Sequence, residues 1–385
     1  MGSKVLRVGI IGTGFIGKQH IEAIRRIPGT EVAAIADQNA DMAKSVKEQF
    51  KIPVCYSDYT ELLKDETIDI VHNCTPSAMH YSINKAVIES GKHVYCEKPL
   101  TLTFAESEEL VLAAREKGVA AGVNFNYRHN AMVREMHERV KNQSIGKVLL
   151  VYARYLQDWL LYDTDYDWRL DPRVGGESRA VADIGSHCFD ILQYILDRRI
   201  TSVYANLITV YPVRKRTEKD NGTYTEKYGN TFKEIPVHSE DAAFIMVRFD
   251  DGTQGLIDLS QVSAGKKNGL DIRINGSDAA LEWEQERADK LWVGHRDTGN
   301  EEIYAGPQFL TGEAKRYATL PGGHSLGWAD ALKSAVNSFY EAILSESFTQ
   351  DLAGYATFND GHYIMKLVEA CLNSSRTKVW VDIVQ

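Results

Sequence analysis

The stretch GIIGTGFIGKQH, residues 9–20, decides the fold class of this chain. Its glycines Gly12, Gly14 and Gly17 follow an apolar run and precede the helical pattern IEAIRRI. In such a turn the first glycine allows a tight bend, the second lets a pyrophosphate approach the backbone, and the third permits close packing of the helix on the strand. Asp37 ends the next apolar run, where a carboxylate can bind both hydroxyls of a ribose. The pattern predicts a dinucleotide-binding domain of the Rossmann type.

Asp37 also favours one of the two nicotinamide dinucleotides. A carboxylate about 4 Å from a 2′-phosphate costs ~1 kcal/mol per charge pair even in water, and the segment DQNAD has no arginine to offset this repulsion, so we expect NAD as the cofactor. A later segment, NCTPSAMH (residues 73–80), ends another predicted strand where the nicotinamide half should lie. A simpler interpretation, a proline-ended strand followed by a helix cap, can hold at the same time. The cofactor contacts expected from these segments are Gly12, Gly14, Phe15, Ile16, Gly17, Asp37, Asn73, Thr75, Pro76 and His80.

The composition of the chain is that of a globular protein with two domains. It has 385 residues, of which 44% are hydrophobic and 25% charged. Its net charge of −9 leaves no basic surface for phosphate backbones, so we expect no nucleic-acid partner and interpret the basic run RKRTEK (residues 214–219) as a solvated loop. Five scattered cysteines without a CxxC pair argue against a disulfide framework and a structural zinc site. Together with the lack of a signal-peptide pattern or an apolar stretch of membrane-spanning length, they predict a cytoplasmic protein with no membrane partner.

The pattern of apolar residues changes near Asn124 and divides the chain into two parts. From Val5 to about Asn124, apolar runs alternate with helical periods, which predicts a parallel sheet covered on both faces. After Asn124, alternating strands such as KVLLVYARYLQ and AAFIMVRFDDG are joined by the short turn sequences DDG and NGSD, which predicts an antiparallel sheet. We therefore expect an α/β protein with a Rossmann domain over residues 1–125 and a domain for substrate binding and oligomerisation over 126–385. Residues 212–237 are polar and weakly periodic, and predict a long excursion between strands.

The stretch HVYCEKPLT, residues 93–101, places a glutamate, a lysine and a proline where a predicted strand leaves the core. Ligands of open α/β folds bind at the carboxyl ends of the strands, so Lys98 is delivered to the cofactor crevice. Pro99 restricts the residue before it and allows a cis peptide bond. The alternative is that Glu97 and Lys98 form a surface ion pair of little energetic value. The residues alone leave both interpretations open.

The helix predicted over AVADIGSHCFDILQYIL, residues 180–196, carries Asp183 and His187 four positions apart and therefore on one face. Such a pair can act as an acid/base group with an orienting carboxylate, or as half of a metal site. A metal site needs two further ligands with suitable spacing, and none is evident, so we expect no metal. A helical histidine can also be a hydrogen-bonded core residue.

Four motifs together resemble those of a known family. They are Gly12-Thr13-Gly14 with Gly17, Glu97-Lys98-Pro99, Trp168-Arg169 before Gly175-Gly176, and Asp183-x-Gly185-x-His187. On these motifs the chain resembles the Gfo/Idh/MocA oxidoreductases, named for glucose–fructose oxidoreductase, inositol dehydrogenase and the rhizopine protein MocA, over essentially its whole length. The resemblance implies an N-terminal Rossmann domain and a C-terminal α/β domain with an open, mostly antiparallel sheet, through which such proteins form homo-dimers or homo-tetramers. Apolar residues on both alternations of the predicted strands also favour an oligomer formed through the sheet.

The resemblance further implies a site with residues from both halves of the chain. Lys98, Asp183 and His187 would surround the reacting carbinol beside the nicotinamide. The segment NFNYRHN, residues 124–130, would lie close to the ligands. The residues added in this way are Glu97, Lys98 and Asn126 for the cofactor, and Lys98, Tyr127, Arg128, Asp183 and His187 for the substrate.

The chemistry of alcohol oxidation suggests a role for each catalytic candidate, because a proton must leave oxygen while a hydride leaves carbon. A lysine with its ordinary pKa near 10.4 is protonated at neutral pH, whereas a histidine with a pKa near 6.5 can be a free base. We therefore expect His187 to be the general base, Lys98 to polarise the oxygen and Asp183 to orient both. A lysine whose pKa is lowered by burial can also act as a base, so the roles of Lys98 and His187 can be exchanged.

The segment YLQDWLLYDTDYDWRLDPR, residues 155–173, interleaves aromatic rings with aspartates and arginines. Rings cover the apolar C–H face of a sugar, while carboxylates and guanidinium groups bind its hydroxyls, so Trp159, Trp168 and Arg169 are candidate substrate contacts. The simpler interpretation is an aromatic loop packed under the helix. His324, in PGGHSLGWAD, is placed to close the same pocket.

The expected substrate is an unphosphorylated hexose, glycoside or inositol, oxidised by NAD at a secondary hydroxyl. One alternative is an NAD-dependent glycosidase or epimerase that oxidises its substrate transiently without net redox change. Another is a non-catalytic cofactor sensor that binds a protein partner. The presence of Lys98, Asp183 and His187 together argues against the sensor, which has no need of all three.

Overall fold

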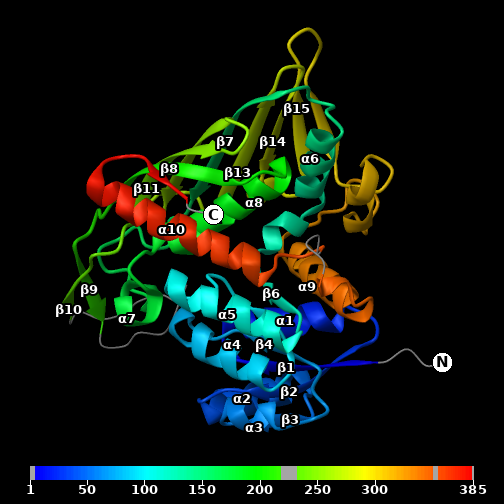
Figure 1. Cartoon of the computed structure of the whole chain (residues 1–385), viewed down its shortest axis with the longest axis vertical. Coiled ribbons are helices and arrows are strands. Elements are labelled where there is room, and N and C mark those ends of the chain that lie inside the picture. Colours follow the sequence, from blue (N-terminus) through cyan, green and yellow to red (C-terminus); the bar gives the residue numbers. More distant parts are fainter. Residues whose placement is uncertain (1–4, 218–231, 350–353, 384–385) are drawn as a thin grey trace. The chain divides into compact units, whose positions relative to one another are not determined.

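Two units make up the fold, and they do not divide the chain at a single point. They comprise Met1–Asn126 with Ala329–Met365, and Tyr127–Trp328 with Lys366–Gln385. The first unit ends at Asn126, next to the expected domain boundary after residue 125. Residues 329–365, which were expected in the second domain, belong to the first unit. The computed structural model in Figure 1 describes residues 5–217, 232–349 and 354–383.

A six-stranded parallel sheet is the centre of the first unit, with the strand order β3-β2-β1-β4-β5-β6. Its strands are β1 (Leu6–Ile11), β2 (Thr30–Ala36), β3 (Val54–Tyr56), β4 (Ile70–Asn73), β5 (His93–Cys96) and β6 (Ala121–Val123). The strand order reverses between β1 and β4, and ligands of such sheets bind outside the carboxyl ends at this switch point. The alternating rhythm of the sequence therefore forms the Rossmann arrangement that it predicts.

Helices connect these strands, and local sequence sets where they end. In α5 the Thr103 side chain accepts from the backbone N–H of Glu106, whose carboxylate accepts from the Thr103 N–H in return, and Gly118 ends the helix at φ +64°. Figure 1 shows these helices around the sheet. The helices are α1 (Phe15–Arg25), α2 (Ala40–Phe50), α3 (Tyr59–Leu63), α4 (His80–Glu89) and α5 (Phe104–Lys117), with most of α9 (Trp328–Leu344) and the first turns of α10 (Phe358–Thr377).

A nine-stranded, mostly antiparallel sheet forms the second unit, in the order β16-β15-β14-β13-β7-β12-β11-β8-β17. Only β7 and β12 are parallel neighbours among these strands. The expected open antiparallel sheet is therefore confirmed. Its strands are β7 (Val148–Leu156), β8 (Ile200–Ile208), β11 (Ala242–Phe249), β12 (Gln254–Ser260), β13 (Gly269–Gly276), β14 (Ala280–Glu284), β15 (Lys290–Gly294), β16 (Glu301–Tyr304) and β17 (Val381–Asp382).

Helices cover one face of this sheet. The helix α8 (Ser186–Leu196) packs against β7 and against α6 (Ala131–Lys141), and Figure 1 shows it, in green, lying along the sheet. A π-helical turn, Val181–Gly185, leads into α8. Along β11, alternate side chains are buried, whereas Phe244 and Met246 between them are exposed. Within the described ranges, none of the helices has the length and apolar character that a membrane span requires.

The segment expected as a polar excursion contains two paired strands, β9 (Val213–Thr217) and β10 (Phe232–Pro236). The interpretation of residues 214–219 as a solvated loop is wrong where the structure describes them. Arg214 lies in β9 with a side chain that is 0% exposed, because it pairs with Asp241 and with backbone carbonyls. Residues 218 and 219 of that run lie outside the described residues.

Candidate active site

The glycine turn between β1 and α1 has the backbone geometry that a nucleotide needs. Gly12 has φ +88°, and a Cβ there would lie 2.7 Å from the carbonyl oxygen of Cys74. A Cβ on Gly17 would lie 2.1 Å from the carbonyl oxygen of Gly12, whereas one on Gly14 would meet nothing within 4 Å. The helix α1 begins directly after this turn, at Phe15, and the N-terminus of a helix favours an anion.

Asp37 is joined to the same turn at the end of β2. Its Oδ2 accepts from the backbone N–H (2.7 Å) and from the hydroxyl (2.8 Å) of Thr13. Its Oδ1 accepts from the N–H of Asn39 (2.9 Å) at the start of α2. These bonds fix a half-buried carboxylate beside the glycine turn.

Asn73 and His80 hold the loop that follows β4. Asn73 accepts from the Thr75 hydroxyl (2.6 Å) and donates to the side chain of Asn84 (2.9 Å). The ring nitrogens of His80 lie 2.9 Å and 2.7 Å from the carbonyl oxygens of Thr75 and Pro99. The ring thus connects this loop with Pro99, and the peptide bond between Lys98 and Pro99 is cis.

Glu97 is a buried carboxylate and not one half of a surface ion pair. Its Oε1 accepts from Nε2 of His20 (2.9 Å) and from Nδ2 of Asn124 (2.6 Å), and its Oε2 accepts from the backbone N–H of Lys98 (3.2 Å). Burial opposes the charge, but His20, Lys98 and Asn124 outweigh it and lower the pKa of Glu97 to about 2. The carboxylate therefore anchors the backbone at Lys98.

A chain of buried hydrogen bonds continues behind Glu97. His20 shares a hydrogen bond with His72 (2.7 Å), and His72 shares one with the hydroxyl of Tyr340 on α9 (2.8 Å). Burial, followed by the charge of His20, holds the pKa of His72 well below its usual value. The Tyr95 hydroxyl donates to Asn124 on the other side (3.0 Å). The first unit thus supports Lys98 from β4, β5, α1 and α9.

In the second unit, His187 lies at the start of α8 against two tyrosines. Its ring centroid is 4.7 Å from that of Tyr127 and 6.2 Å from that of Tyr155. The two tyrosine hydroxyls are 3.0 Å apart, and Asn268 bridges them by donating to Tyr127 (3.0 Å) and accepting from Tyr155 (2.6 Å). Burial raises the pKa of Tyr127, which keeps this phenol protonated.

Asp183 projects from the π-helical turn and is bound on both carboxylate oxygens. Oδ2 accepts from Nε2 of Gln261 (3.0 Å), and Oδ1 lies 3.5 Å from Nε of Arg169. The guanidinium of Arg169 lies 4.3 Å from the Trp168 ring centroid and 5.7 Å from that of Trp159. A carboxylate, a cation and two indole rings therefore share one site, and this is the grouping that suits a polyol.

Comparison with known proteins identifies the family. The model described as "Oxidoreductase family, NAD-binding Rossmann fold" matches residues 6–125, and that described as "GFO/IDH/MocA C-terminal domain" matches residues 133–282. The chain belongs to the GFO/IDH/MocA oxidoreductase family.

Several relatives within this oxidoreductase family are similar over the whole chain or most of it. Levoglucosan dehydrogenase of Pseudarthrobacter phenanthrenivorans is 28% identical, over 99% of this chain and 98% of that protein. Myo-inositol 2-dehydrogenase of Thermotoga maritima is 29% identical, over 66% of this chain and 69% of that protein. A solved structure of levoglucosan dehydrogenase in complex with NADH and L-sorbose has a TM-score of 0.88 and 27% identity, and the match covers 99% of this chain and 100% of that one.

The first unit of this family member is an NAD-binding domain, and its residues fit the cofactor. The space above Gly14, the amides of α1 and the carboxylate of Asp37 suit a pyrophosphate and a ribose. The buried Nδ2 of Asn126 has no hydrogen-bond partner among the described residues, which leaves it available to a ligand. No cluster of three or more His, Cys, Asp or Glu side chains in the described part of the chain could hold a metal ion.

Two of the predicted substrate residues have other contacts. Arg128 donates from Nε to Asp190 on α8 (2.9 Å), pairs with the other oxygen through Nη2, and lies 5.4 Å from the Tyr194 ring centroid. The charge of Arg128 is thus used to hold α8. His324 is exposed, and its Nδ1 lies 3.0 Å from the carbonyl oxygen of Pro321 in its own loop.

The other predicted residues fall into two groups, one in each unit of this oxidoreductase. Those of the first unit lie in the glycine turn and at or after the ends of β2, β4, β5 and β6. Those of the second unit form two sets of contacts: Trp159, Trp168 and Arg169 with Asp183, and Tyr127 with His187. Some residues of the site were not named individually from the sequence, although four of them lie in the stretches quoted above. They are hydrogen-bond partners of the predicted residues or of one another: His20, Asn124, Tyr155, Gln157, Gln261 and Asn268.

Proposed function

We propose that this chain is an NAD-dependent dehydrogenase that oxidises a secondary hydroxyl of a sugar, glycoside or inositol. One observation carries the proposal: the Asp183 carboxylate shares a site with the Arg169 guanidinium and the indole rings of Trp159 and Trp168, in the same unit as His187. Carboxylates and guanidinium groups bind hydroxyls, and rings cover the apolar face of a sugar. The relatives named for levoglucosan and myo-inositol support the same substrate class.

The proposed chemistry assigns one role to each of three side chains. NAD, when bound, supplies the carbon that accepts the hydride. His187 takes the hydroxyl proton, and the ammonium of Lys98 stabilises negative charge on the substrate oxygen. Asp183 binds a substrate hydroxyl and favours the protonated state of His187. Tyr127, whose pKa is raised by burial, stays protonated beside His187 and does not compete for the proton.

NAD is preferred over NADP in this proposal because of Asp37. Thr13 donates twice to its carboxylate and holds it in place. Each charge of a 2′-phosphate would meet a repulsion of ~1 kcal/mol or more at about 4 Å. We expect kcat/KM for NAD to exceed that for NADP by about 10-fold or more, measured on one substrate with both cofactors. Equal values would contradict this role of Asp37.

A single experiment tests the activity. Purified protein is incubated with NAD and a panel of levoglucosan, free hexoses, glycosides and inositols, while the absorbance of reduced cofactor and the identity of the product are followed. Accumulation of NADH together with a keto product is the expected result. A rearranged or hydrolysed product without NADH would identify transient oxidation instead. If the protein binds NAD but forms no product from any of these compounds, the proposed dehydrogenase activity is wrong.

We also propose that this protein is a homo-oligomer formed through the open face of the second sheet. Large apolar side chains are exposed on adjacent strands of that sheet, and the register places Met246 beside Leu256 and Leu256 beside Tyr152. An exposed apolar patch of this kind on a sheet favours association with another copy.

A further inference from the structure

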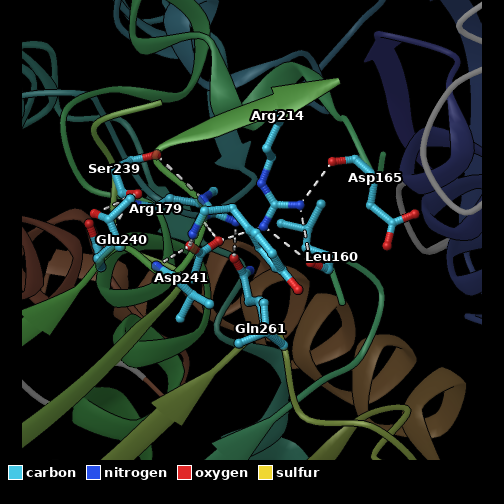
Figure 2. Close-up of polar contacts among 12 residues, drawn as sticks. Leu160, Asp165, Arg179, Arg214, Ser239, Glu240, Asp241 and Gln261 are labelled. Atoms are coloured by element: carbon cyan, nitrogen blue, oxygen red, sulfur yellow. Dashed lines mark hydrogen bonds and ion pairs between the residues drawn. The ribbon is translucent and has the colours of Figure 1, made fainter. Parts of the chain in front are cut away.

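Two fully buried arginines converge on one carboxylate in the second unit. Arg179 and Arg214 both pair with Oδ1 of Asp241, the latter at 2.6 Å, and all three side chains are 0% exposed. Figure 2 shows both guanidinium groups reaching the Asp241 carboxylate. Burying two cations with one aspartate carries a large desolvation penalty, and apolar residues could fill the same volume at lower cost. The cluster therefore calls for an explanation beyond packing.

The backbone satisfies the remaining acceptors of the cluster. Oδ2 of Asp241 accepts from the N–H groups of Val210 (2.7 Å) and Tyr211 (3.0 Å). The neighbouring Glu240 is also buried, and its Oε1 accepts from the N–H groups of Arg179 (3.0 Å) and Val181 (2.8 Å). These bonds fix the start of the π-helical turn that carries the candidate catalytic carboxylate.

One side of the cluster leads to Asp183 through Gln261. Nη1 of Arg179 donates to Oε1 of Gln261 (3.1 Å), and Nε2 of Gln261 donates to Oδ2 of Asp183 (3.0 Å). A guanidinium has only donors, so it fixes which end of the Gln261 amide faces Asp183. Arg179 thereby ensures that Asp183 meets an N–H group and not a carbonyl oxygen. The backbone carbonyl of Arg179 also accepts from the N–H of Asp183 (2.7 Å).

The other side of the cluster holds the aromatic loop. Nη1 of Arg214 donates to the carbonyl oxygens of Leu160 (3.1 Å), Tyr162 (2.8 Å) and Asp165 (3.0 Å). These carbonyls lie between Trp159 and the turn that carries Trp168. One side chain therefore binds three backbone acceptors of this loop, of which the Tyr162 carbonyl also accepts from the N–H of Asp165 (2.9 Å). Figure 2 shows the guanidinium of Arg214 between Asp241 and Asp165.

We propose that Arg179, Asp241 and Arg214 form one positioning unit that sets the Asp183 carboxylate and the aromatic substrate loop relative to each other. Arg179 acts on Asp183 through Gln261, and Arg214 acts on the loop through its backbone carbonyls. Neither arginine touches the substrate. This inference rests on the proposed function, because it assumes that Asp183 and the loop of Trp159 bind the same polyol.

Gln261 gives the sharpest test, because it carries no charge and its replacement leaves both arginines paired. Gln261→Glu keeps the acceptor for Arg179 but presents an oxygen to Asp183, while Gln261→Met removes both contacts at similar volume. If Gln261 only supports Arg179, Gln261→Glu should behave like wild type. The positioning role predicts that kcat falls about 10- to 100-fold in both variants, with KM for the polyol changed less. Gln285→Met, a buried glutamine elsewhere in the unit, is the matched control and should keep kcat.

The loop side is tested with Arg214→Lys, which keeps a buried cation but has only three N–H donors, on one atom, for the three carbonyls and the Asp241 carboxylate together. We expect KM for the polyol to rise about 10-fold, with kcat affected less, and hydrogen–deuterium exchange to increase over residues 160–168. Exchange over these residues that matches the Gln285→Met control would overturn the role of Arg214. Wild-type kcat in Gln261→Glu would overturn the role of Gln261 and Arg179.

Hydrogen exchange also separates this inference from the proposed function. In Gln261→Glu, amides 181–187 should exchange faster than in the control, whether or not any polyol is turned over. If the wild type oxidises none of the compounds but the exchange pattern holds, the proposed function fails and the positioning unit stands. If the wild type is active, and the variants change neither the hydrogen exchange nor the kinetic constants, the positioning unit is wrong and the proposed function stands.

Discussion

His187 is the residue on which the proposed proton transfer depends. Its replacement by Ala removes the base, and we expect kcat to fall by about 10²- to 10⁴-fold, the usual loss for a positioned acid/base group. Steady-state rates with NAD and the best substrate of the panel measure this. His295→Ala changes a histidine that pairs with Glu301 near the β15–β16 turn, and serves as the control. An unchanged kcat in His187→Ala would remove the residue from the mechanism.

The same variant decides between His187 and Lys98 as the base. A histidine base gives oxidation rates that rise with pH through the ordinary histidine range and then level off. This rise should be absent in His187→Ala and present in Lys98→Arg, which keeps the cation. If the rise disappears only when Lys98 is changed, the two roles are exchanged.

Glu97 should contribute to stability in a pH-dependent way. Its pKa is lowered from an ordinary value of 4.5 to about 2 in the folded protein. A carboxyl group with a depressed pKa stabilises the fold above its unfolded pKa, and this stabilisation is lost as the pH falls from 4.5 towards 2. Two and a half pKa units correspond to about 3 kcal/mol.

Glu97→Gln should therefore lower the free energy of unfolding at neutral pH by an amount of this order, and by much less near pH 2. Urea unfolding at both pH values measures the difference. Glu116→Gln, at an exposed site on α5, is the control and should change neither value. A loss that is the same at both pH values would show that packing, and not the charge of Glu97, is responsible.

The sequence pointed to individual residues where they belong to a recognisable motif. The sequence singled out the glycine turn and the Glu97-Lys98-Pro99 stretch, but it left open whether Glu97 was a surface partner of Lys98. What decides the question is the burial of Glu97 with His20 and Asn124, which lie 77 and 27 residues away. Such partners are brought together by the β-strand order, which no local pattern encodes.

At the scale of elements, glycine-to-alanine changes in the β1–α1 turn can distinguish an effect on the fold from an effect on NAD binding. In Gly17→Ala the new Cβ would lie 2.1 Å from the carbonyl oxygen of Gly12, so the turn must distort, and we expect loss of both thermal stability and NAD binding. In Gly14→Ala the Cβ meets nothing within 4 Å, so the fold should be kept. The methyl would instead occupy the space where a pyrophosphate approaches the backbone.

Thermal unfolding and NADH fluorescence titration on both variants test this contrast. Gly14→Ala should keep the wild-type Tm and bind NADH about 10-fold or more weakly. Gly299→Ala, whose Cβ also meets nothing within 4 Å, is the control. Wild-type affinity in Gly14→Ala would place the pyrophosphate elsewhere.

Elements were predictable in proportion to their periodicity. The long apolar runs gave the Rossmann sheet and the antiparallel sheet. The three-residue β3 and the pair β9 and β10 are too short or too polar to show a period. Arg214 illustrates the reason. A charged residue in a sequence is expected to be exposed, but Arg214 is buried because Asp241 and three loop carbonyls bind it.

At the scale of the whole molecule, the sequence could not reveal that residues 329–365 return to the first unit. The helices α9 and α10 are amphipathic, and either unit offers an apolar surface to such helices. A contact that assigns α9 is the hydrogen bond between Tyr340 and His72, which joins residues 268 positions apart.

The oligomer proposed for the second sheet is also a property of the whole molecule. Met246 and Leu256 are exposed neighbours on β11 and β12, and a charge at either would be buried without a partner in an interface. Met246→Glu combined with Leu256→Glu should therefore lower the mass measured by light scattering to that of one chain, with Tm lowered by loss of the interface alone. Leu112→Glu, on an exposed position of α5, should leave the mass unchanged. A double variant that keeps the wild-type oligomeric mass would show that this sheet face is not the interface.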